Sequence, residues 1–331
     1  MPSGDENAEA LWYVAPGRAE IRQERLTPLS EGWVRVRTLY SAISRGTEAL
    51  IAAGKVPESE YQRMRAPFMG GNFPFPVKYG YASVGRVETG PDRLIGQNVF
   101  ALHPHQTVFD VSADSVMPVP AGVPLSRAVL AANMETALNA TWDAEPIPSG
   151  RIAVVGAGVV GALVGFLLAR APGTEVTLID INEAREKIAR ALSLDFAKPE
   201  NAPHDCKLVV HTSADARGLA TAIDIAGDEA TILEMSWYGD RIVPVPLGGA
   251  FHSRRLKIVS SQVGKVAPSR RATTTHRQRL EQAMALLGDS RLDALLTPAV
   301  PFRELPARLP DILDPKSGTL CPLIAYPQDT L

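Results

Sequence analysis

A short glycine-rich segment constrains this chain more than any other feature. Residues 155–161 read Val-Gly-Ala-Gly-Val-Val-Gly, so that Gly156, Gly158 and Gly161 have the G-x-G-x-x-G spacing. The segment follows an apolar run, residues 152–155, and opens an apolar stretch with helical spacing, which is the context that this motif requires. Gly156 permits a tight turn, Gly158 lets a pyrophosphate approach the backbone, and Gly161 lets the helix pack against the strand. The sequence therefore predicts a dinucleotide-binding strand, turn and helix.

The helix after this turn and the strand that follows it complete the predicted cofactor site. Val159 and Val160 open the helix and would offer free N–H groups and the positive end of the helix dipole to phosphates. Asp180 ends the next apolar run, where a carboxylate can accept hydrogen bonds from both ribose hydroxyls of NAD and would repel the 2′-phosphate of NADP. NAD is therefore the expected cofactor. Two alternatives stay open: Asp180 only caps the following helix, or Arg185 reaches around it and admits NADP.

The rest of the second half of the chain alternates between strand and helix patterns, which predicts a parallel sheet with crossover helices. Ser236 and Trp237 end one of the predicted strands. Because ligands bind at the carboxyl ends of such strands, we expect these two residues to border the nicotinamide. The first 120 residues contain instead many short strand patterns separated by Gly and Pro turns, which indicates a small β-rich, barrel-like domain.

Length, charge and cysteine content exclude several classes of protein. The 331 residues suggest two domains, and 34 Lys and Arg against 36 Asp and Glu argue against a dedicated nucleic-acid-binding protein. The two cysteines exclude a disulfide framework and a Cys-rich zinc site. The longest apolar stretch, residues 152–169, contains four glycines and is interpreted as strand, turn and helix, not as a membrane span. The first ten residues do not resemble a signal peptide, so a cytoplasmic protein is expected.

The order of these parts resembles the medium-chain dehydrogenase/reductase superfamily. The segments that carry the resemblance are Tyr40–Glu48, Lys78–Arg86, Gly96–Val99, Gly156–Gly161 and Ser260–Gly264. It implies an α/β protein with a β-rich GroES-like catalytic domain over residues 1–120, to which residues 266–331 return, and a Rossmann doubly wound parallel-sheet domain over 121–265. It also implies hydride transfer between a nicotinamide cofactor and a small carbonyl or alcohol substrate. A homodimer is expected.

The sequence departs from the zinc alcohol dehydrogenases of that superfamily at the metal ligands. Where they carry a Cys ligand, this chain has Ser44 or Arg45, depending on the alignment. Tyr81 replaces the imidazole of their Gly-His-Glu motif, and Glu135, which resembles the Glu ligand of polyol-type members, would stand alone. The four Cys of their structural zinc lobe are missing as well. We therefore expect a zinc-independent protein.

A metal site of a different kind is the alternative to that expectation. His103 and His105 lie between two predicted strands and could chelate a metal together with Glu135. A lone His-x-His pair at a strand turn is more often ordinary core or surface histidine. The sequence therefore favours the absence of a metal.

Without zinc, hydrogen-bond donors and general acids must stabilise the substrate oxygen and handle the proton. Tyr81 is the first candidate because it stands at the position of the lost His ligand. Lys78, three residues earlier, would lower the pKa of its phenol. Ser44 and Thr47 offer hydroxyl relays, and Glu135 is a candidate polar residue of the cleft. The structural alternatives are that Tyr81 only packs and that Lys78 is a solvated surface residue.

The predicted cleft places Tyr81 and Glu135 on one wall and Gly158 and Trp237 on the other. The aromatic side chains between residues 61 and 81 could form a lid, which favours an apolar or aromatic substrate, or could bury one another in a long loop. Two other functions stay open. The chain could be an enoyl or quinone reductase, or a cofactor-binding protein without catalytic activity.

Overall fold

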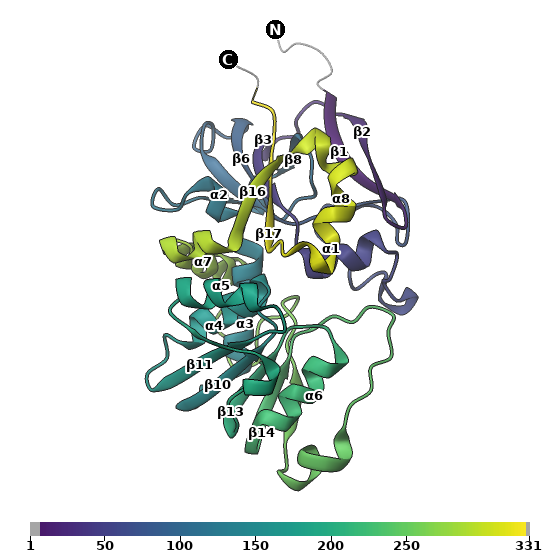
Figure 1. Cartoon of the computed structure of the whole chain (residues 1–331). Coiled ribbons are helices and arrows are strands. Elements are labelled where there is room, and N and C mark those ends of the chain that lie inside the picture. Colours follow the sequence, from purple (N-terminus) through teal and green to yellow (C-terminus); the bar gives the residue numbers. More distant parts are fainter. Residues whose placement is uncertain (1–6, 329–331) are drawn as a thin grey trace. The chain divides into compact units, whose positions relative to one another are not determined.

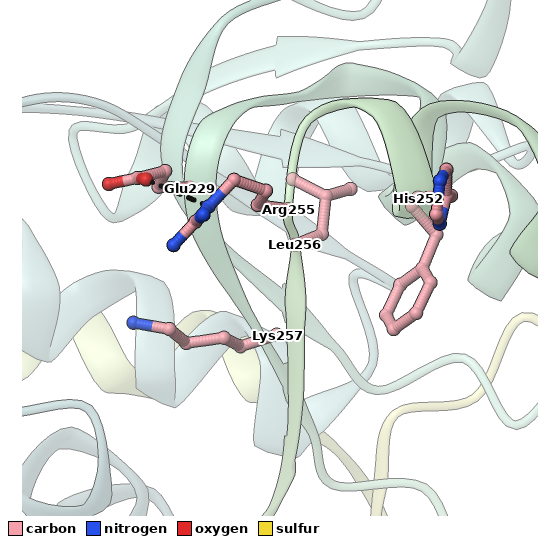
Figure 2. Close-up of a pocket in the computed structure, with 6 residues that line it drawn as sticks. Glu229, His252, Arg255, Leu256 and Lys257 are labelled. Carbon is pink, nitrogen blue, oxygen red and sulfur yellow. Dashed lines mark ion pairs between the residues drawn. The ribbon is translucent and has the colours of Figure 1, made fainter.

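The two sequence patterns form two separate units in the computed structural model, which describes residues 7–328 (Figure 1). One unit extends to Ala132 and resumes at Leu296, and the other is Asn133–Leu295. The sequence placed the boundaries at 120/121 and 265/266, so residues 121–132 and 266–295 differ from that expectation. Residues 266–295 belong with the second unit, where several of their side chains are buried; Val266 and Ala267, for example, pack against Trp142.

The second unit is built on a six-stranded parallel sheet with the order β12-β11-β10-β13-β14-β15 (Figure 1). The strands are β10 (Gly150–Val155), β11 (Thr174–Ile179), β12 (Asp195–Ala197), β13 (Cys206–His211), β14 (Ala226–Glu234) and β15 (Lys257–Ser260). The order reverses at β10, which is the doubly wound Rossmann arrangement. The prediction of a Rossmann-type sheet is confirmed, and the glycine turn follows its central strand.

The α-helices of the second unit are α3 (Ala131–Asp143), α4 (Val159–Leu168), α5 (Glu186–Ala191), α6 (Ala216–Ile225) and α7 (His276–Leu286). The first two residues of α3 precede the boundary of the unit at Asn133. Helix α4 packs against β10 and β11, and α6 buries one apolar face, including Leu219 and Ile223, against the sheet. A short helix, α2 (Leu125–Ala128), precedes α3 in the chain.

The first unit consists mainly of antiparallel strands. Its larger sheet has the order β16-β17-β3-β6-β7-β9, with β8 also paired to β3, and its smaller sheet has the order β2-β1-β5-β4. The strands of the larger sheet are β3 (Trp33–Ala42), β6 (Ser83–Thr89), β7 (Asn98–Ala101), β8 (Val108–Ser112), β9 (Val116–Pro118), β16 (Leu296–Pro301) and β17 (Cys321–Ala325). Those of the smaller sheet are β1 (Asn7–Ala15), β2 (Arg18–Arg25), β4 (Gly70–Gly71) and β5 (Val77–Lys78). A β-rich first unit was predicted and is confirmed.

The tail of the chain completes this unit. Strand β17 pairs antiparallel with β3, and helix α8 (Leu305–Leu313) packs near α1 (Arg45–Ala52) and β2. The alternation in β3 buries Val34 and Val36 in a core shared with β6, β7 and β8.

Within residues 7–328, none of the helices combines the length and the apolar character needed to span a bilayer.

His103 is a buried ring in the core of the first unit. It stacks on Phe109 with ring centroids 3.9 Å apart and an interplanar angle of 8°, and Phe68 lies 5.6 Å away. Its Nδ1 is 2.9 Å from the carbonyl oxygen of Pro104. Burial lowers the pKa of His103 from 6.5 to about 3. The imidazole is therefore an uncharged part of the core at neutral pH.

This depressed pKa predicts a loss of stability in acid. The unfolded chain binds a proton on His103 near pH 6.5, whereas the folded chain does so only near pH 3. Between these values the free energy of unfolding should fall by about 1.4 kcal/mol for each pH unit from this group alone, and above pH 6.5 the contribution is constant. His103→Phe keeps an aromatic ring and removes the titration, so urea melts should show a shallower pH dependence between pH 6 and pH 4. The exposed His252→Phe is the matched control, and equal slopes for wild type and His103→Phe would contradict the assignment.

Candidate functional site

The glycine turn between β10 and α4 leaves open space beside one of its glycines only. Gly156 has φ of 107°, and a Cβ there would lie 2.7 Å from the backbone nitrogen of Ser213. A Cβ on Gly161 would collide with the carbonyl oxygen of Gly156. Gly158 is exposed, and nothing lies within 4 Å of a Cβ built on it. Gly156 and Gly161 are thus required for packing, whereas Gly158 borders empty space at the start of α4, where Val159 and Val160 form the first turn.

Asp180 braces this turn from the end of β11. Its Oδ2 accepts a hydrogen bond of 2.8 Å from the backbone N–H of Ala157, and its Oδ1 accepts one of 2.8 Å from the N–H of Asn182. Each carboxylate oxygen has a further lone pair, so the group can still accept a bond from a ligand hydroxyl. Arg185 is buried near it: burial lowers the pKa of Arg185, and the charge of Asp180 opposes that shift.

The carboxyl ends of β13 and β14 carry a polar cluster that the sequence analysis missed. Nδ1 of His211 is 2.7 Å from Oε2 of Glu234, and Nε2 of His211 is 2.7 Å from Oγ of Ser213. The backbone N–H of Ser236 donates to Oε1 of Glu234 over 2.7 Å. Burial acts to raise the pKa of Glu234, but the bonds from His211 and Ser236 outweigh it and hold that pKa below its usual value. The available signal was that both apolar strands end in a polar residue, and Ser236 and Trp237 follow directly.

In the first unit, three of the predicted catalytic residues lie together. The hydroxyl of Tyr81 is 3.1 Å from Oγ1 of Thr47 and also bonds to the side chain of Ser44. Desolvation raises the pKa of Tyr81 to about 12, with the two hydroxyls acting in the opposite direction. Tyr81 precedes β6 and is not part of a strand. Its phenol is half-buried and protonated at neutral pH.

Lys78 does not join this group. Its Nζ donates to Oε2 of Glu24 over 2.6 Å and to Oε1 of Gln106 over 2.9 Å. The expected lowering of the pKa of Tyr81 by this ammonium is therefore wrong: the pKa is raised, and Lys78 is not among the groups that shift it. The reason is geometric: Lys78 ends β5, and the chain leaves regular strand geometry before Tyr81, with φ of 125° at Gly80.

A buried carboxylate behind these hydroxyls was also missed. Oε1 of Glu48 accepts a bond of 2.8 Å from the backbone N–H of Ser44, and its Oε2 accepts a bond of 2.7 Å from the hydroxyl of Tyr13 and lies 3.0 Å from Nε2 of His105. Nδ1 of His105 is 2.8 Å from Oγ of Ser41. All of these side chains except that of Ser44 are buried. The cluster holds the turn that carries Ser44 and Thr47.

Glu135 lies in the second unit, on α3. Its Oε1 accepts a bond of 3.0 Å from Nε of Arg279 on α7, and both side chains are buried. Burial raises the pKa of Glu135, and Arg279 partly compensates. This carboxylate forms a structural ion pair between two helices, whereas Tyr81 belongs to the other unit. The prediction that Glu135 is a polar residue of the cleft stays a prediction.

The residues at the ligand positions of zinc enzymes do not fit a zinc ion. Among residues 7–328, no three His, Cys, Asp or Glu side chains are grouped so that they could hold a metal. Ser44 and Tyr81 bring hydroxyls that bond to each other, and zinc sites are built from thiolate, imidazole and carboxylate. The alternative site of His103, His105 and Glu135 is not assembled: the first stacks on Phe109, the second bonds to Glu48 and the third to Arg279.

The aromatic loop before Tyr81 packs largely on itself. Tyr61 and Phe73 have ring centroids 5.6 Å apart, Phe73 and Tyr79 5.9 Å, and Tyr79 and Tyr81 6.1 Å. Only Phe68 among the loop's phenylalanines is a large exposed hydrophobic side chain. This arrangement favours the reading of a loop that buries its own aromatic rings.

Comparisons with known proteins agree with the fold described here. A family model described as ketopantoate reductase PanE/ApbA matches residues 152–224, the first part of the Rossmann-type sheet. A search of curated proteins finds no match. L-idonate 5-dehydrogenase from Escherichia coli K-12 is similar in structure, with 13% identity, a TM-score of 0.79, and coverage of 98% of this chain and 99% of that chain.

Two further solved structures contain a cofactor. An alcohol dehydrogenase from Escherichia coli CFT073, complexed with NADH, has 16% identity, a TM-score of 0.76, and coverage of 97% of this chain and 99% of that chain. A putative zinc-binding dehydrogenase from Sinorhizobium meliloti 1021, bound to NADP, has 15% identity, a TM-score of 0.75, and coverage of 97% and 99%. At such identities the likeness establishes the fold: a β-rich unit and a parallel-sheet unit along nearly the whole chain.

The open space at Gly158 gives a sharp test of ligand binding at the turn. Gly158 has φ of −73°, which alanine adopts freely, so Gly158→Ala should leave the thermal midpoint unchanged. Its methyl group would fill the space beside the backbone, and NADH affinity measured by calorimetry should fall about tenfold or more. Gly161→Ala, which collides with backbone, should unfold instead. Gly248→Ala, also unobstructed, is the control; unchanged NADH affinity in Gly158→Ala would argue against a dinucleotide at this turn.

Proposed function

We propose that this protein is a zinc-independent oxidoreductase of the medium-chain dehydrogenase/reductase type that uses NAD(H) and acts on a small carbonyl or alcohol substrate. The observation that carries the proposal is the glycine turn, in which the backbone at Gly158 borders open space beside the carboxylate of Asp180. The structural likeness to dehydrogenases solved with NADH or NADP supports it. The donor set described above supports the absence of zinc.

The second unit would hold the cofactor. The first turn of α4, at Val159 and Val160, would receive the pyrophosphate on its N–H groups, and Asp180 would accept a bond from the adenosine ribose. Ser236 and Trp237 would border the nicotinamide half. When bound, the nicotinamide supplies or accepts the hydride. The protein's part is to bind and orient the cofactor.

Tyr81 of the first unit would handle the proton. A phenol with a pKa of about 12 carries its proton at neutral pH and can donate a hydrogen bond, and then the proton, to a substrate oxygen that gains negative charge. Thr47 and Ser44 contact the same hydroxyl and would orient it and pass the proton on. Lys78 and Glu135 have no part in this proposal, because each already has partners elsewhere.

Reduction of a conjugated C=C bond is a second candidate. It is favoured by the donor set, because hydride addition to an enone or quinone does not need a Lewis-acid metal. A screen of alcohols, ketones, quinones and enones with both NADH and NADPH would separate the two activities. Binding of cofactor without turnover of any of these substrates would favour a non-catalytic, cofactor-binding protein.

The cofactor preference follows from Asp180. We expect NADH to bind at least about tenfold more tightly than NADPH, because the carboxylate repels the 2′-phosphate. Asp180→Asn keeps an acceptor for the N–H of Ala157 and removes the charge, so NADPH affinity should improve in that variant. Isothermal titration with both cofactors measures this. Tighter binding of NADPH by the wild type would point to Arg185 as a phosphate ligand.

The role of Tyr81 predicts a selective loss of turnover. Tyr81→Phe should lower kcat by about 100-fold or more on a substrate found in the screen, the usual scale for a positioned acid or oxyanion donor. NADH affinity should stay nearly unchanged, because the phenol belongs to the other unit. Tyr61→Phe, in the same aromatic loop, is the matched control.

Full turnover by Tyr81→Phe would refute the role of Tyr81 as proton donor and make Ser44 and Thr47 the next candidates.

The proposed mechanism also predicts the metal content of the purified protein. After extensive dialysis, elemental analysis should find far less than one zinc per chain. About one zinc per chain would overturn the metal-free mechanism.

We also propose a homodimer formed through β15. This strand ends the sheet, pairs only with β14, and is exposed along its length, including Ile258 and Val259. An exposed apolar edge strand is a template for pairing with a second chain. Sedimentation should give twice the mass of one chain, and Val259→Lys, which places a charge on the edge, should give a monomer. A monomeric wild type would contradict the proposal.

A further inference from the structure

Glu234 holds both sequence neighbours of Trp237. Its Oε1 accepts the backbone N–H of Ser236 over 2.7 Å, and its Oε2 accepts the hydroxyl of Tyr238 over 3.2 Å. Trp237 itself is half-buried. A tryptophan whose two neighbours are bonded to one carboxylate is presented in a restricted position at the end of β14.

His211, at the end of β13, forms a hydrogen bond with Glu234. Its side chain is fully buried at the end of β13, and its Nδ1 lies 2.7 Å from Oε2 of Glu234. Because an ionised carboxylate only accepts hydrogen bonds, Nδ1 must donate to Glu234, and Nε2 lies 2.7 Å from Oγ of Ser213. The imidazole therefore links the loop after β13 to the loop after β14.

Further bonds tie the two loops together at the surface. Oγ of Ser236 accepts the backbone N–H of Ala214 over 3.1 Å. The guanidinium of Arg241 donates to the carbonyl oxygen of Ala214 over 2.9 Å and to that of Tyr238 over 3.1 Å. Hydrogen bonds thus join the loops after β13 and β14 into one continuous edge of the sheet.

This edge adjoins the glycine turn. The backbone N–H of Thr212 donates to the carbonyl oxygen of Val155 over 2.8 Å, and its Oγ1 donates to that of Gly156 over 2.8 Å. The pyrophosphate position is set by the turn, and in doubly wound sheets the ligand extends along the carboxyl ends of the strands. A dinucleotide bound with its adenosine near Asp180 would therefore extend its other half along the polar cluster.

A largely buried polar cluster needs a reason other than stability. Removing a carboxylate from water is costly, and well-packed apolar side chains are often equally stabilising in its place. What the cluster achieves is geometric, because it determines where the backbone of residues 236–238 and the indole of Trp237 lie. A large flat indole provides contact area with little conformational entropy to lose.

We propose that Glu234 and His211 are positioning residues that hold Trp237 and its neighbours against the nicotinamide-riboside half of the bound cofactor. This inference rests on the proposed function, since it presupposes that a nicotinamide dinucleotide binds at the glycine turn. It assigns a role to a buried histidine and a partly buried carboxylate that the proposed chemistry itself does not use. Neither residue touches the reacting atoms in this proposal.

The test compares a whole cofactor with its adenine half. NADH and ADP are titrated calorimetrically against wild type, Glu234→Leu, Glu234→Gln and Trp237→Leu. Glu234→Leu should weaken NADH about tenfold or more and leave ADP within about twofold, because ADP does not reach the edge at β14. Glu234→Gln should restore most of the affinity, since its oxygen can accept from Ser236 and its amide can donate to Nδ1 of the other imidazole tautomer. Glu186→Leu, an exposed residue of α5, is the matched control.

Trp237→Leu lies outside the buried cluster and guards against a folding defect in Glu234→Leu. It should show the same selective loss of NADH affinity at an unchanged thermal midpoint. It should also abolish most of the energy transfer from tryptophan to bound NADH, a readout that does not depend on turnover.

The outcomes separate this inference from the proposed function. If wild type binds neither NADH nor ADP, the proposed function fails and this inference with it. If wild type binds both, and Glu234→Leu and Trp237→Leu bind NADH as wild type does, the positioning role alone is overturned. Equal loss of NADH and ADP in Trp237→Leu would also overturn it, because the effect would then not be confined to the nicotinamide half.

Discussion

The second unit depends on the contact between the glycine turn and the start of the loop after β13. Thr212 bonds through both its N–H and its hydroxyl to carbonyl oxygens at the end of β10, and the backbone of Ser213 lies where a side chain on Gly156 would be. This close approach brings the ends of the two central strands together and leaves α4 with its N-terminus facing open space. Because the order of strands reverses at β10, the same contact adjoins both the proposed phosphate site and the edge of the sheet at β13 and β14.

Each unit also contains a carboxylate that forms hydrogen bonds with side chains from other segments of the chain. Glu48 collects bonds from Tyr13, Ser44 and His105, and Glu234 collects them from His211 and Ser236. A carboxylate taken out of water must be fully hydrogen-bonded, so each one dictates the positions of its donors. In the first unit this places the turn that carries the hydroxyls around Tyr81. In the second unit it places the loop that carries Trp237.

The features that the sequence predicted are local, and those it missed are not. The glycine spacing and the strand before it lie within one short segment, and they identify the Rossmann-type unit because turn and helix chemistry act over few residues. The partners of Glu48 and Glu234 lie 57 and 23 residues away from them, at His105 and His211. Such pairs are determined by the strand order, which a local pattern does not contain. Lys78 shows the converse error: its nearness to Tyr81 in the sequence suggested a contact, but its ammonium bonds to Glu24 and Gln106 instead.

The environment of Tyr81 bears on the direction of the proposed reaction. A lysine beside the phenol would have stabilised phenolate, a base suited to removing the proton of an alcohol. The structure partly buries the phenol and places the charge of Glu48 nearby, and these two effects raise its pKa to about 12, although the hydroxyls of Ser44 and Thr47 act in the opposite direction. Such a group keeps its proton at neutral pH and stabilises a developing oxyanion by donation. For the proposed oxidoreductase, this electrostatic setting favours protonating a substrate oxygen during reduction over deprotonating an alcohol during oxidation.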